Sequence, residues 1–129
     1  MAAQLNHTIV WCRDQKKSSA FLTEILDLPP PRRFSHFDVV DLGNGVSLDF
    51  ADHEGPIARQ HYAFLVDDAG FDHGMAVIAR HGLTFWADPA QKKAGEINRH
   101  WGRRGVYFED PDGHVLELIT KPYGAEEDA

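Results

Sequence analysis

The segment Asp110–Thr120, DPDGHVLELIT, decides the fold of this chain. Its Asp-Pro-Asp-Gly start is typical of a tight turn, and the apolar run after it is typical of a short strand. Glu117 interrupts that run between Leu116 and Leu118. A strand that is apolar on both sides is expected to be covered on both faces, where an unpaired carboxylate costs several kcal/mol. Glu117 therefore needs a partner, and a metal cation is one candidate.

The same arrangement occurs earlier in the chain, in an internal repeat. The order strand, helix and about three strands is predicted twice, in modules spanning residues 4–51 and 60–121. The last strand of each module has a carboxylate four residues after a glycine, Asp49 after Gly45 and Glu117 after Gly113. Asp49 is therefore a pseudo-symmetric candidate ligand, although its side chain is one methylene shorter than that of Glu117.

The first strand of each module has a histidine near its start, His7 in LNHTIV and His61 in RQHYAF. If the modules form one curved sheet, alternation of side chains along the strands can direct both histidines and Glu117 into a common concavity. Two imidazoles and one carboxylate on one face of a divalent metal leave positions open for substrate or dioxygen. The alternative is that each histidine is a hydrogen-bonded core or rim residue and each acid faces solvent. The repeat favours the metal site.

Composition predicts one domain with a real core, because 43% of the 129 residues are hydrophobic and 11% are aromatic. The net charge of −7 disfavours binding to nucleic acid or to an anionic membrane. A single cysteine, Cys12, cannot form an internal disulfide. The opening residues lack the pattern of a signal peptide, and no apolar run approaches the roughly 18 residues of a membrane span. A cytoplasmic protein is expected.

Apolar residues recur at helical spacing from Arg13 to Leu28 and from Asp67 to Gly82. The prolines at 29–31 are predicted to end the first helix, and Asn44-Gly45 predicts a β-hairpin. The other predicted segments are a short strand over 32–34, a connection over 52–60, a polar loop over 88–104 and a frayed acidic tail over 124–129.

With these motifs the chain resembles the vicinal-oxygen-chelate superfamily, which includes glyoxalase I, the extradiol dioxygenases, and the fosfomycin-resistance and bleomycin-resistance proteins. The resemblance covers residues 4–121 and is most specific in GVYFEDPDGHVLELIT. It implies a single α+β domain in which two βαβββ modules form a curved mixed sheet, or cup, with the helices on the outside. It also implies a homodimer, with the cup built either within one chain or across two.

Matched residue by residue, the resemblance makes His7, His61 and Glu117 the metal ligands, and glyoxalase I also has a carboxylate ligand at the position of Asp49. Tyr107 matches a tyrosine that contacts substrate in the fosfomycin enzymes, although an aromatic cross-strand pair is an equal alternative. The chain departs from those enzymes in other places. Their thiol-transferring members have a threonine where this chain has an isoleucine at position 9, and the loop INRHWGRRG lacks their serine and glutamate.

The resemblance implies a metal-dependent enzyme whose substrate chelates the metal through neighbouring oxygens. We favour an extradiol-dioxygenase-like oxygenase with Fe(II), with Glu117 and Tyr107 as catalytic residues and an aromatic or glutathione-linked substrate. One alternative is a glyoxalase-like isomerase or lyase with Ni(II), Zn(II) or Mn(II), in which Glu117 is the base. The other is a metal-free protein that sequesters an aromatic compound or antibiotic. The predicted substrate contacts are Trp11, Phe50, Trp86, Arg99, Arg103 and Tyr107, the two arginines lying in a loop that otherwise reads as solvated.

Overall fold

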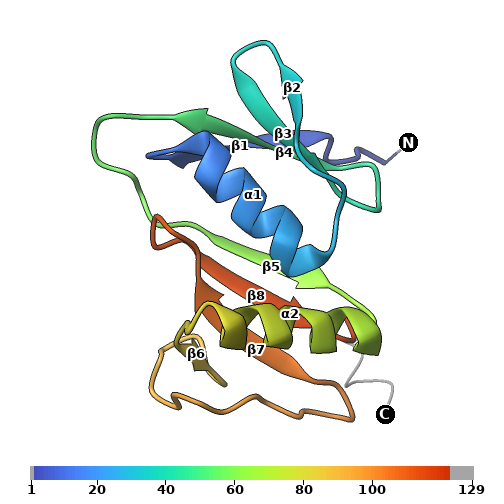
Figure 1. Cartoon of the computed structure of the whole chain (residues 1–129). Helices are drawn as coiled ribbons and strands as arrows, with labels where there is room; N and C mark the ends of the chain where they lie inside the picture. The colour runs from blue at the N-terminus through green and yellow to red at the C-terminus, as the bar shows by residue number, and fades with distance from the viewer. Residues whose placement is uncertain (1, 123–129) are drawn as a thin grey trace.

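Each half of the chain folds into one four-stranded mixed sheet and one helix in the computed structural model, which describes residues 2–122 (Figure 1). The strand order is β1-β4-β3-β2 in the first sheet and β5-β8-β7-β6 in the second. The predicted α+β fold of two βαβββ modules is confirmed; the predicted tail lies outside the described residues. The elements are β1 (His7–Cys12), α1 (Gln15–Leu26), β2 (Arg32–Phe34), β3 (Phe37–Asp41), β4 (Ser47–Asp52), β5 (His61–Leu65), α2 (Asp68–Arg80), β6 (Phe85–Trp86), β7 (Gly105–Glu109) and β8 (Val115–Ile119).

Helix α1 is shorter than the apolar spacing predicted, because acidic residues cap both of its ends. The carboxylate of Asp14 accepts hydrogen bonds from the backbone amides of Lys16 and Lys17, which starts the helix at Gln15. At the other end Asp27 adopts a left-handed conformation with φ of 54°, so the helix stops before the prolines are reached. Neither helix within residues 2–122 has the length and apolar character needed to cross a bilayer.

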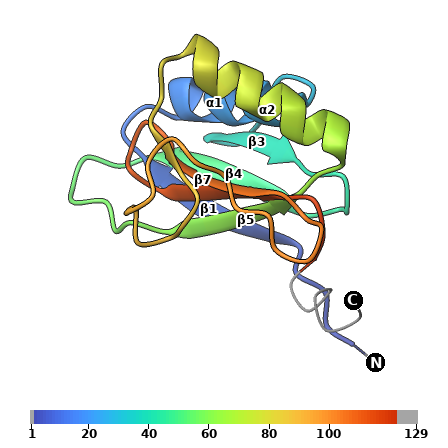
Figure 2. The ribbon, with the colours of Figure 1, turned by 90° about the horizontal axis from the view of Figure 1, so that it is seen from below.

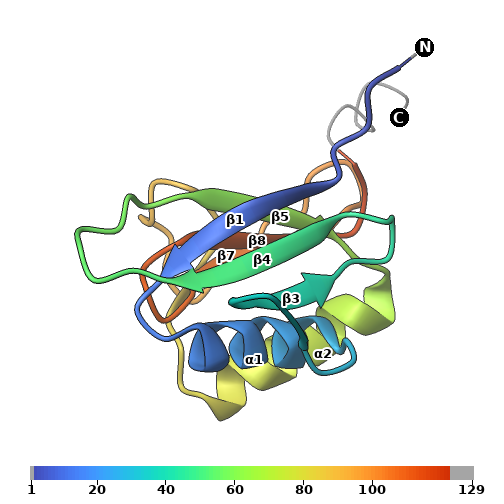
Figure 3. The same cartoon turned by 90° about the horizontal axis from the view of Figure 1, so that it is seen from above.

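Both helices lie on the same side of the two sheets, and the opposite side carries no helix (Figures 2 and 3). We call this uncovered side the open face. Strand residues that point toward the helices form one core that runs through both modules, including Val10, Phe50, Phe64 and Leu118, each at most 8% exposed. The outward position of the helices therefore agrees with the prediction, and the open face is where a site can form.

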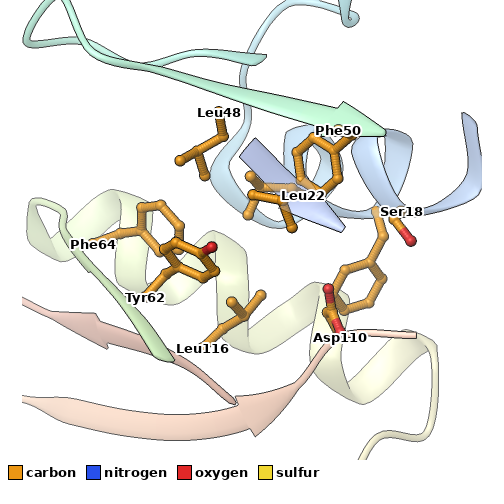
Figure 4. Close-up of a pocket in the computed structure, with 10 residues that line it drawn as sticks. Ser18, Leu22, Leu48, Phe50, Tyr62, Phe64, Asp110 and Leu116 are labelled. Atoms are coloured by element: carbon orange, nitrogen blue, oxygen red, sulfur yellow. The ribbon is translucent and has the colours of Figure 1, made fainter. Parts of the chain in front are cut away.

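The core leaves almost no space between the modules. The seam between β4, β5, β8 and α1 encloses a cavity of only about 10 Å³, bordered by Leu22, Leu48, Phe64 and Leu116 among others (Figure 4). That volume is at the limit of what a single water molecule requires. The interior between the two modules therefore has no room for a substrate.

The turn at the start of the DPDGHVLELIT segment joins the two modules. His114 is 1% exposed; its Nδ1 accepts a hydrogen bond from the amide of Gln60, so its Nε2 carries the proton and donates to the carbonyl of Trp11 at 2.8 Å. Asp112 accepts hydrogen bonds from the amide of Arg13 and from the hydroxyl of Ser18. The motif thus ties the start of β8 to the end of β1 and the start of α1.

We expect His114→Ala to lower the free energy of unfolding by about 3 kcal/mol, because it removes a buried ring, its hydrogen bond to Trp11 in the first module and its hydrogen bond from Gln60 in the second. The matched control is His36→Ala, since His36 is exposed and contacts only its neighbours Ser35 and Phe37. Urea denaturation followed by circular dichroism measures both variants. Equal stability of the two variants would show that this turn does not hold the modules together.

Cys12 is fully buried in β1, and burial, with the nearby carboxylates of Asp112 and Asp52, raises the pKa of its thiol to about 12. At pH 8 almost none of it is the reactive thiolate. We expect a disulfide-exchange reagent to leave the native protein unmodified and to modify one thiol per chain after unfolding. Rapid labelling of the native protein would show that β1 opens readily.

Candidate metal centre on the open face

The parallel pairing of first and last strands places a histidine and a carboxylate close together in each module. In the second sheet His61 lies opposite Val115 and Ala63 lies opposite Glu117. The first sheet repeats this register, with His7 opposite Ser47 and Ile9 opposite Asp49. Because residues two apart on a strand share a face, the histidine and the carboxylate of each module both point to the open face.

In the second module the two groups are in contact. Nε2 of His61 lies 3.1 Å from Oε1 of Glu117, and Nδ1 of His61 lies 3.0 Å from the carbonyl oxygen of Val115. The His61 side chain is 48% exposed, whereas that of Glu117 is 1% exposed. The pair therefore has one buried end, fixed by the central strand β8, and one end that opens to solvent.

The hydrogen-bond chemistry of this pair requires a cation. A carbonyl oxygen can only accept, so Nδ1 of His61 must carry the proton that it donates to Val115. In the neutral imidazole, Nε2 is then an acceptor that faces a carboxylate oxygen, another acceptor. A second proton or a metal ion must resolve this contact. Donation from Nδ1 to a backbone carbonyl is also how metal-binding histidines are commonly oriented, with Nε2 left to bind the ion.

His7 has the same internal arrangement but a different setting. Its Nδ1 lies 2.7 Å from the side-chain oxygen of Asn6, so it donates there and leaves Nε2 as an acceptor. His7 is exposed on β1, at the edge of the first sheet. No three histidine, cysteine or acidic side chains among residues 2–122 lie close enough together to bind one metal ion. A single chain therefore does not bring His7 to His61 and Glu117.

Asp49, the pseudo-symmetric counterpart of Glu117, does not join the pair either. Its residue is 8% exposed, and Oδ1 accepts a hydrogen bond of 3.0 Å from the hydroxyl of Ser47. The shorter aspartate thus makes a contact along its own strand, where Glu117 reaches across to His61. The two modules share a backbone register, but only the second forms a histidine–carboxylate contact.

The predicted substrate contacts divide between the two faces of the sheets. Tyr107 lies opposite Glu117 on β7 and opposite Trp86 on β6, and its ring stacks on that of His61 with centroids 6.0 Å apart. Trp11 also lies on the open face, on the edge strand β1, and is 47% exposed. Phe50 does not belong to this group: it is 3% exposed on the helix side of β4, because its position is one residue out of phase with Asp49.

Arg99 and Arg103 lie in the segment that follows β6, which is more ordered than the predicted polar loop. Asn98 exchanges two backbone hydrogen bonds with Gly105, and its side-chain amide donates to the carbonyl of Ala87. A Cβ atom at Gly105 would lie 2.6 Å from the Asn98 side-chain oxygen, so a larger residue there would displace the Asn98 side chain. Residue spacing carries no signal for Asn98, because its partners are distant in sequence.

Comparison with known proteins places this geometry in a family. The model of the Glyoxalase/Bleomycin resistance protein/Dioxygenase superfamily matches residues 4–118. The chain is 31% identical over 124 residues to the glutathione transferase FosA of Serratia marcescens, covering 92% of this chain and 81% of that protein.

Two solved structures are more similar. Oxidase ChaP-H1 is 52% identical with a TM-score of 0.93, over 95% of this chain and 99% of that one. Oxidase ChaP-H2 is 51% identical with a TM-score of 0.94, over 98% and 99% of the two chains. The chain therefore belongs to the Glyoxalase/Bleomycin resistance protein/Dioxygenase superfamily, also known as the vicinal-oxygen-chelate superfamily.

Proposed function

We propose that this protein is a metal-dependent oxygenase that acts on a small aromatic molecule, with Fe(II) held by His61, Glu117 and a third ligand, His7. The contact between Nε2 of His61 and the buried carboxylate of Glu117 carries the proposal, because two acceptors at 3.1 Å need a proton or a metal ion between them, and a metal ion can be held by both. Two imidazoles and one carboxylate are a ligand set that suits a non-haem iron and leaves positions open.

The third ligand, His7, comes from a second copy of the chain. Strand β1 and the segment before it display exposed apolar side chains on either side of His7, with Leu5 68%, Ile9 39% and Trp11 47% exposed. Leu65, on the edge strand β5 beside the candidate centre, is 59% exposed. Apolar residues on uncovered edge strands favour association. Packing β1 of one copy against the open face of another copy's second module buries these residues and supplies the missing imidazole.

Each residue then has a definite task. Glu117 gives a negative charge at the buried end of the centre, and Val115 fixes the orientation of the His61 ring through its carbonyl oxygen. Tyr107 stacks on His61 and presents its ring to whatever occupies the open side. A bound Fe(II) ion supplies the Lewis acidity and one-electron chemistry that activate dioxygen and a chelating substrate.

The proposed oxygenase function is supported by sequence identities of 52% and 51% to the oxidases ChaP-H1 and ChaP-H2. A second candidate, thiol transfer to a small molecule, is favoured by the similarity to the glutathione transferase FosA. Ile9, on the open face two residues from His7, offers no hydroxyl to a polar substrate. Its apolar side chain agrees better with an aromatic substrate than with a small, highly charged one.

The reaction class is tested by loading the protein with Fe(II) under anaerobic conditions and then adding catechols and air. We expect oxygen uptake in proportion to the bound iron, and none with Zn(II), because only iron cycles electrons to dioxygen. Consumption of glutathione with an epoxide substrate, without oxygen uptake, would identify a transferase instead. Ligand binding that is indifferent to metal would identify a sequestering protein.

Glu117→Gln is expected to weaken Fe(II) binding by at least about 100-fold, because it removes a charged ligand, and loss even of groups that only orient a ligand costs 10- to 100-fold. The matched control is Glu109→Gln on the neighbouring strand β7, where the carboxylate binds Arg59 and Gln91. Titration with Fe(II) followed by a chromophoric chelator measures both affinities. Retention of wild-type affinity by Glu117→Gln would refute the proposed ligand set.

Mixed dimers test whether the ligands come from two chains. His7→Ala and Glu117→Gln are each expected to bind no metal tightly. In a two-fold dimer that contains one chain of each variant, one site lacks both His7 and Glu117. The other site has all three wild-type ligands. Mixing the variants in equal amounts with unfolding and refolding should restore about a quarter of the wild-type iron content. No recovery, with dimers confirmed by size, would mean that the ligands belong to one chain.

A further inference from the structure

A second cavity lies next to the candidate centre, beneath the segment between β6 and β7. It has a volume of about 300 Å³ and is bordered by residues 87–103 on one side and by Tyr107 on the other. We call it the loop cavity. Its wall combines apolar and charged groups and includes Ala87, Pro89, Ile97, Arg99, Arg103 and Tyr107.

Tyr107 is the wall that the loop cavity shares with the candidate centre. It lies opposite Glu117 in the β7–β8 register, and its ring stacks on His61 at 6.0 Å with an interplanar angle of 28°. A ligand that reaches the open side of the His61–Glu117 pair can therefore extend past this ring into the loop cavity. The cavity is placed to receive a substituent, and none of the candidate ligands His7, His61 and Glu117 borders it.

Arg103 distinguishes this cavity from an ordinary surface hollow. Arg103 is only 8% exposed. Arginine is seldom buried, because moving its charge out of water costs free energy. The backbone forces it inward: Trp101 and Gly102 are both left-handed, with φ of 51° and 77°, and the amide of Arg103 donates to the carbonyl of His100. A left-handed conformation is unfavourable for tryptophan. In this strained turn Arg103 is buried and borders the cavity, whereas Trp101 is 54% exposed.

The charge around the cavity also favours an anion. Lys93, Arg99 and Arg103 border it, against Asp88 and Glu96. The carboxylate of Asp88 accepts hydrogen bonds from the backbone amides of Lys92 and Lys93, which offset its charge. Three basic side chains thus border the cavity against two acidic ones, in a protein whose net charge is −7.

We infer that the loop cavity binds a planar oxyanion of the substrate, a carboxylate or an acidic phenolate, through the guanidinium of Arg103. A guanidinium presents a planar fork of donors that matches such a group, and the flat ring of Tyr107 suits an aromatic body between the anion and the chelating oxygens. The inference rests on the proposed function for the position of those oxygens. It narrows the substrate class to catechol-like molecules with an anionic substituent.

Binding to the metal-free protein tests this cavity separately from the reaction. The probes are catechol, 3,4-dihydroxybenzoate and 4-nitrocatechol, with inorganic phosphate as a tetrahedral anion, and the signal is tryptophan fluorescence, because Trp86 is paired with Tyr107. We expect the two anionic catechols to bind at least about tenfold more tightly than catechol, a difference of about 1.4 kcal/mol. If only dihydroxybenzoate binds more tightly than catechol, the cavity binds a carboxylate. If only nitrocatechol does, it binds an acidic phenol. Equal affinity for all three catechols, or tighter binding of phosphate, would overturn the inference.

Two adjacent arginines provide a matched pair of variants. Arg103→Gln is expected to abolish the tenfold preference for the anionic catechols, and Arg103→Lys is expected to retain part of it. Arg104→Gln should leave the preference unchanged, because Arg104 points away to Asp68 and Asp72 and stacks on Phe71. Preference for the anion in Arg103→Gln equal to that of the wild type would refute the role of Arg103. If Arg103→Gln does not fold, Arg103→Lys and the wild-type comparison still decide the question.

Failure of this inference is distinguishable from failure of the proposed function. Iron binding and oxygen uptake without any preference for an anionic catechol would refute the anion site and leave the proposed oxygenase function intact. A preference for the anion in a protein that binds no metal would leave the cavity as the binding site of a sequestering protein.

Discussion

The contact between a histidine nitrogen and a buried carboxylate oxygen is the constraint on which the open face depends. Nδ1 of His61 donates a hydrogen bond to the carbonyl oxygen of Val115, so in the neutral ring only the lone pair of Nε2 faces Glu117. The carboxylate cannot turn toward water, because it belongs to the central strand β8 and its side chain is 1% exposed. The contact is therefore completed either by a further proton or by the metal ion of the proposed centre, and preorganised electrostatic groups of this kind are usually the largest single term in catalysis.

The fold creates this contact through strand pairing and secures it through a turn. Parallel pairing of β5 with β8 brings together residues 56 positions apart, and the hydrogen bonds of His114 and Asp112 hold the start of β8 against the first module. The DPDGH motif is thus a structural joint, and the catalytic candidate follows it on the strand. The interior between the two modules is filled with core residues, and the candidate centre and the loop cavity both lie outside it.

Much of this arrangement was predictable from residue patterns. The internal repeat, both hairpins, both helices and the short strand Arg32–Phe34 follow from periodicity and turn chemistry, which are local properties. The repeat and the family resemblance predicted that His7, His61 and Glu117 bind one metal ion, and the structure places His61 and Glu117 in contact. Helix α1 proved shorter than its apolar spacing, because Asp14 and Asp27 cap it at both ends. Phe50 was expected beside the substrate but points into the core, since a shift of one residue along a strand reverses the face of the side chain.

Two features had no signal in the residue patterns. The burial of Arg103 arises from two left-handed residues before it and from the Asn98–Gly105 anchor, none of which has a periodic pattern. The separation of His7 from its expected partners arises from the way in which the modules pack through their helices and the His114 joint. The sequence by itself determined the two modules, their strand and helix order and the types of ligand, because alternation and helical spacing are set by neighbouring residues. Only the tertiary structure decided which groups meet, because inter-module packing depends on long-range contacts, and it left β1 and its histidine exposed at the edge of a sheet.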